Sequence, residues 1–253
     1  MLARRLAHLL RGHDRPVRHR RRLARLILEL SGRPPPPDFA EDFPRFAELR
    51  DALDVSIAGD DGEVIEETFL ELYTHLHQAE TPYTADERAR LDAAGGYWAH
   101  AGGLGPVLMA PDHLDQGSVS ADFGAGNGLQ ALLFQLLAPH RKTIQIEISA
   151  GMVAVGRRLQ SWFGIPGERV EWVVGDVIDH TPRGIDMLYL YRPVRPDGPG
   201  RAFYERFAQA VEEAPRPMTI LSVADGLGVF LSDRFDVAYC DGHLTRYEGP
   251  RPG

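Results

Sequence analysis

One segment of the chain restricts its fold more than any other. In Asp122-Phe123-Gly124-Ala125-Gly126-Asn127-Gly128, an acidic residue closes an apolar run and three glycines follow at every second position. A leucine-rich helical pattern comes next. Glycine is favoured where the chain needs a positive φ or where the backbone approaches a ligand closely. The segment therefore predicts a strand that ends in a tight turn and opens a helix whose first N–H groups face a ligand.

Around this segment, short apolar runs alternate with helical patterns. The expected strands are 118–123, 143–148, 169–175, 185–191 and 217–224, and the expected helices are 128–138, 150–163 and 199–214. Such alternation predicts a parallel sheet covered by helices. The connection 176–184 is too short for a crossover helix and predicts a loop or a single turn. At the end of the chain, the runs 235–239 and 244–247 flank Asp241-Gly242, a hairpin signal that predicts an antiparallel pair.

The sequence before the sheet predicts helices. Helical patterns cover 2–12, 17–30, 44–57, 62–79 and 84–95, and four prolines at 34–37 interrupt them. Ile65, Phe69, Leu72 and Leu76 share one helix face, and Thr84 with Glu87 has the spacing of a capping box. We expect a basic helical arm over 1–30, a Pro-rich linker over 31–43, a helical cap over 44–110 and the sheet domain over 111–253.

Charge separates the arm from the rest of the chain. Residues 1–30 hold nine arginines against Asp14 and Glu29, a net of +7, which leaves a net of −15 for the other residues. A body that acidic repels phosphate backbones, which argues against nucleic acid as the partner. Lys142 is the only lysine, which suggests a GC-rich bacterial coding sequence.

Cysteine and apolar content bear on location. Cys240 is the only cysteine, so the chain has no internal disulfide and no thiolate zinc cluster. We interpret Cys240 as a small, partly buried residue in a reducing, cytoplasmic protein. No apolar run reaches the roughly 18 residues of a membrane-spanning helix, so we expect no membrane span.

The glycine spacing also bears on the type of ligand. The dinucleotide fingerprint G-x-G-x-x-G requires a third glycine where this chain has Leu129, so NAD fits poorly. Glu147 ends the next strand about twenty residues later, where a carboxylate accepts hydrogen bonds from ribose hydroxyls. Asp176 ends the third strand and is placed to accept from an adenine amino group. All three acids are expected at one edge of the sheet, where ligands of open α/β sheets bind.

Together these residues resemble the class I S-adenosylmethionine (SAM)-dependent methyltransferases, over about residues 95–250. The resemblance implies a Rossmann-like, mostly parallel seven-stranded α/β sheet with a C-terminal antiparallel hairpin, preceded by an α-helical extension. It implies SAM as the cofactor, bound by the domain 111–253, and an enzyme that moves a methyl group by direct displacement to a protein or small-molecule acceptor. A non-catalytic interaction or scaffold module with the same fold is the alternative.

The resemblance also assigns site residues. Asp122 and the turn Gly124–Gly128 would surround the methionine part of the cofactor, Glu147 the ribose, and Asp176 with Val177 the adenine. The full set of cofactor residues is Asp122, Phe123, Gly124, Ala125, Gly126, Gly128, Glu147, Ile148, Met152, Asp176 and Val177.

The acceptor is expected after the fourth strand. That segment lacks the Asn/Asp-Pro-Pro-aromatic motif of family members that methylate amide or nucleobase nitrogens. Tyr191 and Arg192 are the candidates for orienting an acceptor, with Arg192 pairing with an anionic group; a packed aromatic and a solvated arginine are the alternatives. Tyr97, Trp98 and His100 either form a lid over the cofactor or pack on the body. The acidity of the cap, by contrast, suits a cationic acceptor.

No metal site is expected. His75 and His77 lie two residues apart on a predicted helix, so they point in different directions.

Overall fold

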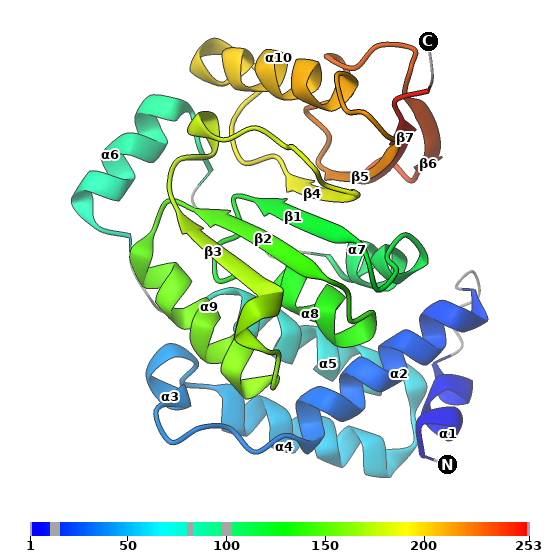
Figure 1. Cartoon of the computed structure of the whole chain (residues 1–253). Helices are drawn as coiled ribbons and strands as arrows, with labels where there is room; N and C mark the ends of the chain where they lie inside the picture. The colour runs from blue at the N-terminus through cyan, green and yellow to red at the C-terminus, as the bar shows by residue number, and fades with distance from the viewer. Residues whose placement is uncertain (1, 11–15, 80–82, 98–102, 252–253) are drawn as a thin grey trace. The chain divides into compact units, whose positions relative to one another are not determined.

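The computed structural model describes residues 2–10, 16–79, 83–97 and 103–251, and the chain forms two compact units, Met1–Thr81 and Pro82–Gly253. Unit 1 is helical and unit 2 contains the sheet (Figure 1). This grouping places residues 83–97 in the same unit as the sheet. The division into arm, linker, cap and sheet domain stays a prediction.

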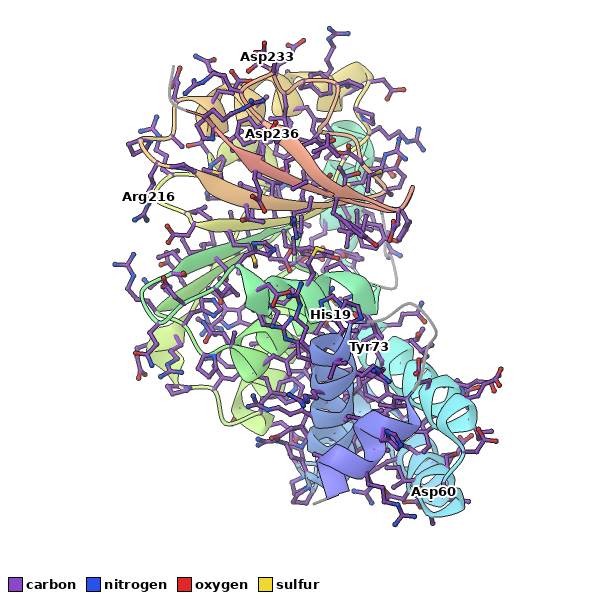
Figure 2. The ribbon with its side chains drawn as sticks, turned by 90° about the vertical axis from the view of Figure 1, so that its right-hand side faces the viewer. His19, Asp60, Tyr73, Arg216, Asp233 and Asp236 are labelled. Carbon is purple, nitrogen blue, oxygen red and sulfur yellow. The ribbon has the colours of Figure 1, made fainter. Side chains whose placement is uncertain are left out.

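Unit 1 is built from α1 (Leu2–Leu9), α2 (Val17–Gly32), α3 (Phe39–Asp42), α4 (Phe46–Gly59) and α5 (Gly62–His77). The predicted apolar face of α5 is buried, and Tyr73 on the same helix is buried as well (Figure 2). α2 ends at Gly32, directly before the proline run. The short helix α3 was not predicted; its Phe39 packs against Phe43 and Phe46 at centroid distances of 4.7 and 4.8 Å.

Unit 2 begins with α6 (Ala85–Ala94), α7 (Leu104–Met109) and the 3-10 turn η1 (Ala110–Asp112). Its sheet consists of β1 (Val119–Phe123), β2 (Lys142–Glu147), β3 (Val170–Val174), β4 (Met187–Tyr191), β5 (Met218–Val223), β6 (Asp236–Cys240) and β7 (Leu244–Gly249). The strand order is β3-β2-β1-β4-β5-β7-β6. β1 to β5 pair in parallel and β7 pairs antiparallel with β5 and β6. The fold class predicted from the sequence is therefore confirmed.

Three helices cover the sheet. α8 (Leu129–Leu137) and α9 (Ala150–Trp162) lie on one face and α10 (Gly198–Glu212) on the other (Figure 1). Phe203, Tyr204 and Phe207 of α10 pack into the core beneath β1, β4 and β5. The turn η2 (Gly167–Arg169) precedes β3, and η3 (Val177–Asp179) is the single turn predicted between β3 and β4.

The C-terminal hairpin follows its turn signal. Asp241 accepts hydrogen bonds from the N–H groups of His243 (2.9 Å) and Leu244 (2.8 Å), and Gly242 has a φ of 89°. Asp236 at the start of β6 pairs with Arg251 at 2.7 Å (Figure 2). The interpretation of Cys240 as a partly buried residue is wrong, because all five residues of β6 are exposed at the edge of the sheet.

One aromatic ring packs against the backbone of two helices. The indole of Trp172 on β3 lies where Cβ atoms at Gly128 and Gly156 would lie, and its Nε1–H donates to Oε1 of Gln160 at 2.8 Å. Gly128 precedes α8 and Gly156 lies within α9. The ring therefore sets how closely both helices approach β2 and β3 beneath the glycine turn.

Candidate functional site

The glycine turn joins β1 to α8 at the carboxyl edge of the sheet. Gly124, Gly126 and Gly128 have φ values of 84°, 57° and 68°, so backbone geometry favours glycine at all three positions. A Cβ at Gly124 would also lie 3.0 Å from Cβ of Pro193, in the segment after β4. The turn is therefore a close junction between the ends of β1 and β4.

The N–H groups of this turn have protein partners. Gly124 and Ala125 donate to the carbonyl of Ile146 at 3.0 and 2.9 Å, and Gly128 donates to Ala125 at 2.8 Å. The N–H of Gly126 donates to Oε2 of Glu147 at 2.8 Å. A ligand is thus left with side chains and the surface of the turn. The first N–H of α8, that of Leu129, donates to Oδ1 of Asn127 at 3.2 Å, and the expectation that the first N–H groups of this helix face a ligand stays a prediction.

Glu147 ends β2 and is buried. Its Oε2 accepts from Gly126, and its Oε1 accepts from the N–H of Ser149 at 2.9 Å. Burial raises the pKa of Glu147, against the opposing effect of these amide donors. An ionised carboxylate has about four lone-pair sites, so about two remain for further donors. Two vicinal hydroxyl groups are donors that would use them.

Asp122 lies one strand away, in the central strand β1. Its Oδ2 is buried and has no hydrogen-bond partner among the described residues. Burial, followed by the charge of Glu147, raises the pKa of Asp122 well above its ordinary value. A buried, unpartnered carboxyl oxygen costs free energy unless a donor or a cation reaches it. The site therefore favours a ligand that brings positive charge.

The other predicted cofactor residues differ in their surroundings. Ile148, Met152 and Val177 are buried, and Cε of Met152 lies 3.8 Å from where a Cβ of Gly126 would be. Asp176 is half-buried and caps η3, because its Oδ1 accepts from the N–H of Ile178 at 3.1 Å. Phe123, by contrast, turns its ring into the core against Phe207 at 5.0 Å, so it offers the site only its backbone.

A segment far away in sequence lies beside Glu147. Glu87 of α6 accepts from the N–H of its own N-cap residue Thr84 at 2.7 Å and from the N–H of Ala150, at the start of α9, at 3.2 Å. Burial, together with the carboxylates of Glu147 and Glu87, raises the pKa of Tyr83. The sequence predicted the capping box correctly. It gave no signal that Tyr83 and Glu87 lie beside the end of β2.

The other end of α6 is attached beyond β4. Gly96 forms a bridge with Val194, and the N–H of Arg195 donates to Gly95 at 3.0 Å. None of the ten residues of α6, all of them described, is buried. α6 thus lies along the carboxyl edge of the sheet, held near its two ends (Figure 1).

The predicted acceptor residues end β4. Tyr191 is half-buried, burial raises its pKa, and its ring meets that of His243 edge-on at 6.0 Å. Arg192 has a φ of 37°, which is unusual for a residue with a side chain. Its guanidinium lies 5.8 Å from the ring centre of Tyr97. Trp98 and His100, also proposed for a lid, lie outside the described residues.

Strand order locates these groups relative to one another. The chain order along the sheet reverses between β1 and β4, and ligands of open α/β sheets bind outside the carboxyl ends at such a switch point. Asp122 and the glycine turn stand on the β1 side, while Tyr191 and Arg192 stand on the β4 side. The structure thus brings the two predicted groups of site residues to the same junction.

Two expectations concern features away from this junction. His75 accepts a hydrogen bond from the N–H of Arg45 at 3.2 Å, and the described residues contain no group of three or more His, Cys, Asp or Glu suited to a metal ion. None of the helices in the described part of the chain is long and apolar enough to cross a membrane.

Comparison with known proteins gives similarity at the level of structure. No family model and no curated protein sequence matches the chain. An RNA methyltransferase from Salinibacter ruber in complex with S-adenosyl-L-homocysteine (SAH) aligns over 66% of this chain and 92% of its own, with 18% identity and a TM-score of 0.42. A methyltransferase from Geobacter sulfurreducens aligns over 67% and 92%, with 16% identity and a TM-score of 0.43. A SAM-dependent methyltransferase from Thiobacillus denitrificans with SAH aligns over 58% and 50%, with 18% identity and a TM-score of 0.35.

At these identities and TM-scores the similarities carry no conclusion about activity. The fold class follows from the strand order of this chain, a mostly parallel Rossmann-like sheet with β7 inserted antiparallel between β5 and β6. The evidence on function therefore comes from the side chains at the β1–β4 junction.

Proposed function

We propose that this chain is a SAM-dependent methyltransferase acting on a protein or small-molecule acceptor. The observation that carries the proposal is the pair of buried carboxyl groups, Asp122 and Glu147, beside a glycine turn at the switch point. Coulombic repulsion between them contributes to the raised pKa of Asp122. A cationic ligand relieves that repulsion, whereas an anionic one adds to it.

This charge preference separates SAM from the dinucleotides. SAM carries a sulfonium and an ammonium group, while NAD brings a diphosphate that a dinucleotide site binds at a helix N-terminus. Here the N–H groups of Gly124, Gly126 and Gly128 are already bonded within the protein. The turn therefore suits the cation better than the diphosphate.

The chain's own groups fit such a cofactor. In this proposal the unpartnered Oδ2 of Asp122 takes the positively charged methionine part, and the remaining lone pairs of Glu147 take the ribose hydroxyls. Ile148, Met152 and Val177 supply an apolar surface for the adenine, with Asp176 at its rim. SAM, when bound, supplies an electrophilic methyl group. Tyr191 and Arg192 then orient the acceptor from the β4 side.

Calorimetric titration of the whole chain tests the proposal. We expect SAM and SAH to bind and NAD to leave no detectable heat at the same concentrations. Incubation with methyl-labelled SAM and fractionated bacterial extract should then transfer label to a protein or small-molecule fraction. Binding of NAD without SAM contradicts the proposal, and binding of SAM without any transfer supports the non-catalytic scaffold instead.

A further inference from the structure

Two arginines after β4 share one aromatic ring. The guanidinium carbons of Arg192 and Arg195 lie 5.8 and 5.9 Å from the ring centre of Tyr97. The backbone holds the three residues together, because Tyr97 N–H donates to the carbonyl of Pro193 at 3.3 Å. Cation–π contacts of this kind orient a guanidinium without neutralising its charge. The segment therefore holds two positive charges at one aromatic ring.

Neither charge has an ion-pair partner among the residues that the structure describes. In the described part of the chain, neither Arg192 nor Arg195 has a carboxylate within ion-pair distance, although the whole chain has 36 acidic residues and a net charge of −8. Some other arginines of unit 2 are paired, such as Arg201 with Glu205 at 2.7 Å and Arg216 with Asp186 at 2.8 Å. Two unpaired cations at one aromatic ring are available to bind an anion from outside.

The donor geometry of Arg192 supports the same conclusion. Its Nε is shielded from solvent and has no hydrogen-bond partner among the described atoms. A guanidinium offers Nε–H and Nη–H as a fork that matches the two oxygens of a carboxylate or phosphate. A bound anion would therefore satisfy this donor.

The backbone of Arg192 is also in an uncommon conformation. Its φ of 37° is positive, whereas the same strand end could turn with less strain if glycine stood there. Strain of this kind persists where the surroundings fix a residue for a purpose, and it is concentrated at binding sites. At Arg192 this backbone conformation coincides with a side-chain Nε that has no hydrogen-bond partner among the described atoms.

The location connects these charges to the methyl-transfer site. Pro193, which lies between the two arginines in sequence, has its Cβ 3.0 Å from where a Cβ of Gly124 would be. Arg192 follows Tyr191 directly, and β4 pairs with β1 up to Leu190 and Phe123. An anion held by Arg192 is thus beside the glycine turn, on the acceptor side of the switch point.

We propose that Arg192, Arg195 and Tyr97 form an anion site that binds a carboxylate or phosphate group of the methyl acceptor. The inference rests on the proposed function and narrows it, because it selects acidic acceptors over the cationic ones that the acidity of the chain would suit. Arg192 is the primary ligand through its fork, Arg195 adds the second charge, and Tyr97 keeps the two guanidinium groups in place.

Titration of the whole chain with inorganic phosphate and with succinate, followed by NMR with and without saturating SAH, tests the anion site. We expect saturable binding to the wild type. Binding to Arg192→Gln should be at least about tenfold weaker, because this variant loses one charge-assisted bidentate contact. Arg192→Lys should fall between them, because an ammonium keeps the charge but not the fork. The matched control is Arg201→Gln, an exposed arginine of α10, which should bind as the wild type does.

Each other outcome overturns the proposal. Equal anion affinity in the wild type, Arg192→Gln and Arg195→Gln removes the site. Anion binding that SAH abolishes, or a loss of SAH affinity in Arg192→Gln, assigns the cations to the carboxylate of the cofactor instead. Methyl transfer to a basic peptide that Arg192→Gln leaves undiminished excludes an acidic acceptor.

Two controls separate loss of the anion site from misfolding and from loss of cofactor binding. Circular dichroism and thermal unfolding report whether Arg192→Gln folds; if it does not, the exposed Arg195→Gln carries the test with the same expected direction. The titration without SAH does not depend on the cofactor. Failure of the proposed function, seen as no binding of SAM or SAH to the wild type, is therefore distinct from failure of the anion site.

Discussion

The carboxylate of Glu147 accepts a hydrogen bond from the backbone N–H of Gly126 at 2.8 Å. The acid that ends β2 therefore fixes the turn that ends β1, across 21 residues of sequence. This contact gives Glu147 two tasks, since the same carboxylate is the proposed partner of the cofactor's ribose. Substitution at Glu147 should affect both the turn and the ligand.

Glu147→Gln should weaken SAH binding by about 1–3 kcal/mol, because an amide replaces a carboxylate that accepts several hydrogen bonds. Calorimetry should show this as a Kd that is roughly 5- to 150-fold higher, which is the same free energy expressed as a ratio of dissociation constants. Glu171→Gln on β3 is the matched control, since Glu171 is exposed and pairs with Lys142. Unchanged SAH affinity in Glu147→Gln would remove Glu147 from the site.

Asp122→Asn should stabilise the ligand-free protein above about pH 5 while weakening cofactor binding. Because the pKa of Asp122 is raised in the folded state, the folded protein holds this proton more tightly than the unfolded chain does. The free energy of unfolding is thus higher at low pH and falls as pH rises from the ordinary aspartate pKa of about 4 toward the raised value. The variant should lose this component of the pH dependence.

Thermal unfolding between pH 4 and 8 measures this effect, with SAH titration alongside. Asp233→Asn, an exposed aspartate near the C-terminal hairpin, serves as the control and should keep the wild-type pH profile (Figure 2). A wild-type profile in Asp122→Asn, or SAH affinity equal to that of the wild type, is the result that contradicts the assignment.

Gly128→Ala should destabilise the protein more than Gly126→Ala. Both positions have positive φ, which costs an alanine about 1–2 kcal/mol. At Gly128 the new Cβ also overlaps Oε1 of Gln145 and the indole of Trp172, whereas at Gly126 the nearest atom is 3.8 Å away. Overpacking adds about 1–3 kcal/mol at Gly128 alone. Urea unfolding of the two variants gives the order, and the reverse order would refute this packing account.

Glu87→Gln should loosen α6 from the start of α9. The carboxylate of Glu87 accepts from both Thr84 and Ala150, but a glutamine has one acceptor oxygen and cannot serve both well. We expect a loss of about 0.5–2 kcal/mol of local stability, comparable to the loss of a helix cap. Hydrogen exchange should speed up over residues 85–94, and Asp92→Asn on the same helix should not have this effect.

Sequence patterns predicted the sheet well because it is built from local signals. Each strand is a short apolar run, the Asp241-Gly242 turn specifies the hairpin, and the Thr84–Glu87 box begins α6. Two short helices were not predicted. α7 follows a glycine-rich stretch and carries Pro106 in its first turn, where proline is tolerated in a helix but resembles a break in sequence.

The site was less predictable, for a different reason. Asp122, Glu147 and the glycines belong to one motif, and the strand order brings them together. Tyr83 and Glu87 reach the end of β2 only through the path of α6, which no spacing in the sequence records. The strain and the unpartnered Nε of Arg192 likewise depend on how β4 ends in three dimensions.

The packing of Trp172 against Gly128 and Gly156 has a consequence for sequence evolution. One indole excludes a Cβ at two positions, but at each of them a second constraint acts as well. A Cβ at position 156 would lie 2.7 Å from the carbonyl oxygen of Asn127, and position 128 has a positive φ of 68°. In homologues that carry a smaller residue at position 172, glycine should therefore persist at both 128 and 156, since loss of the ring alone releases neither position.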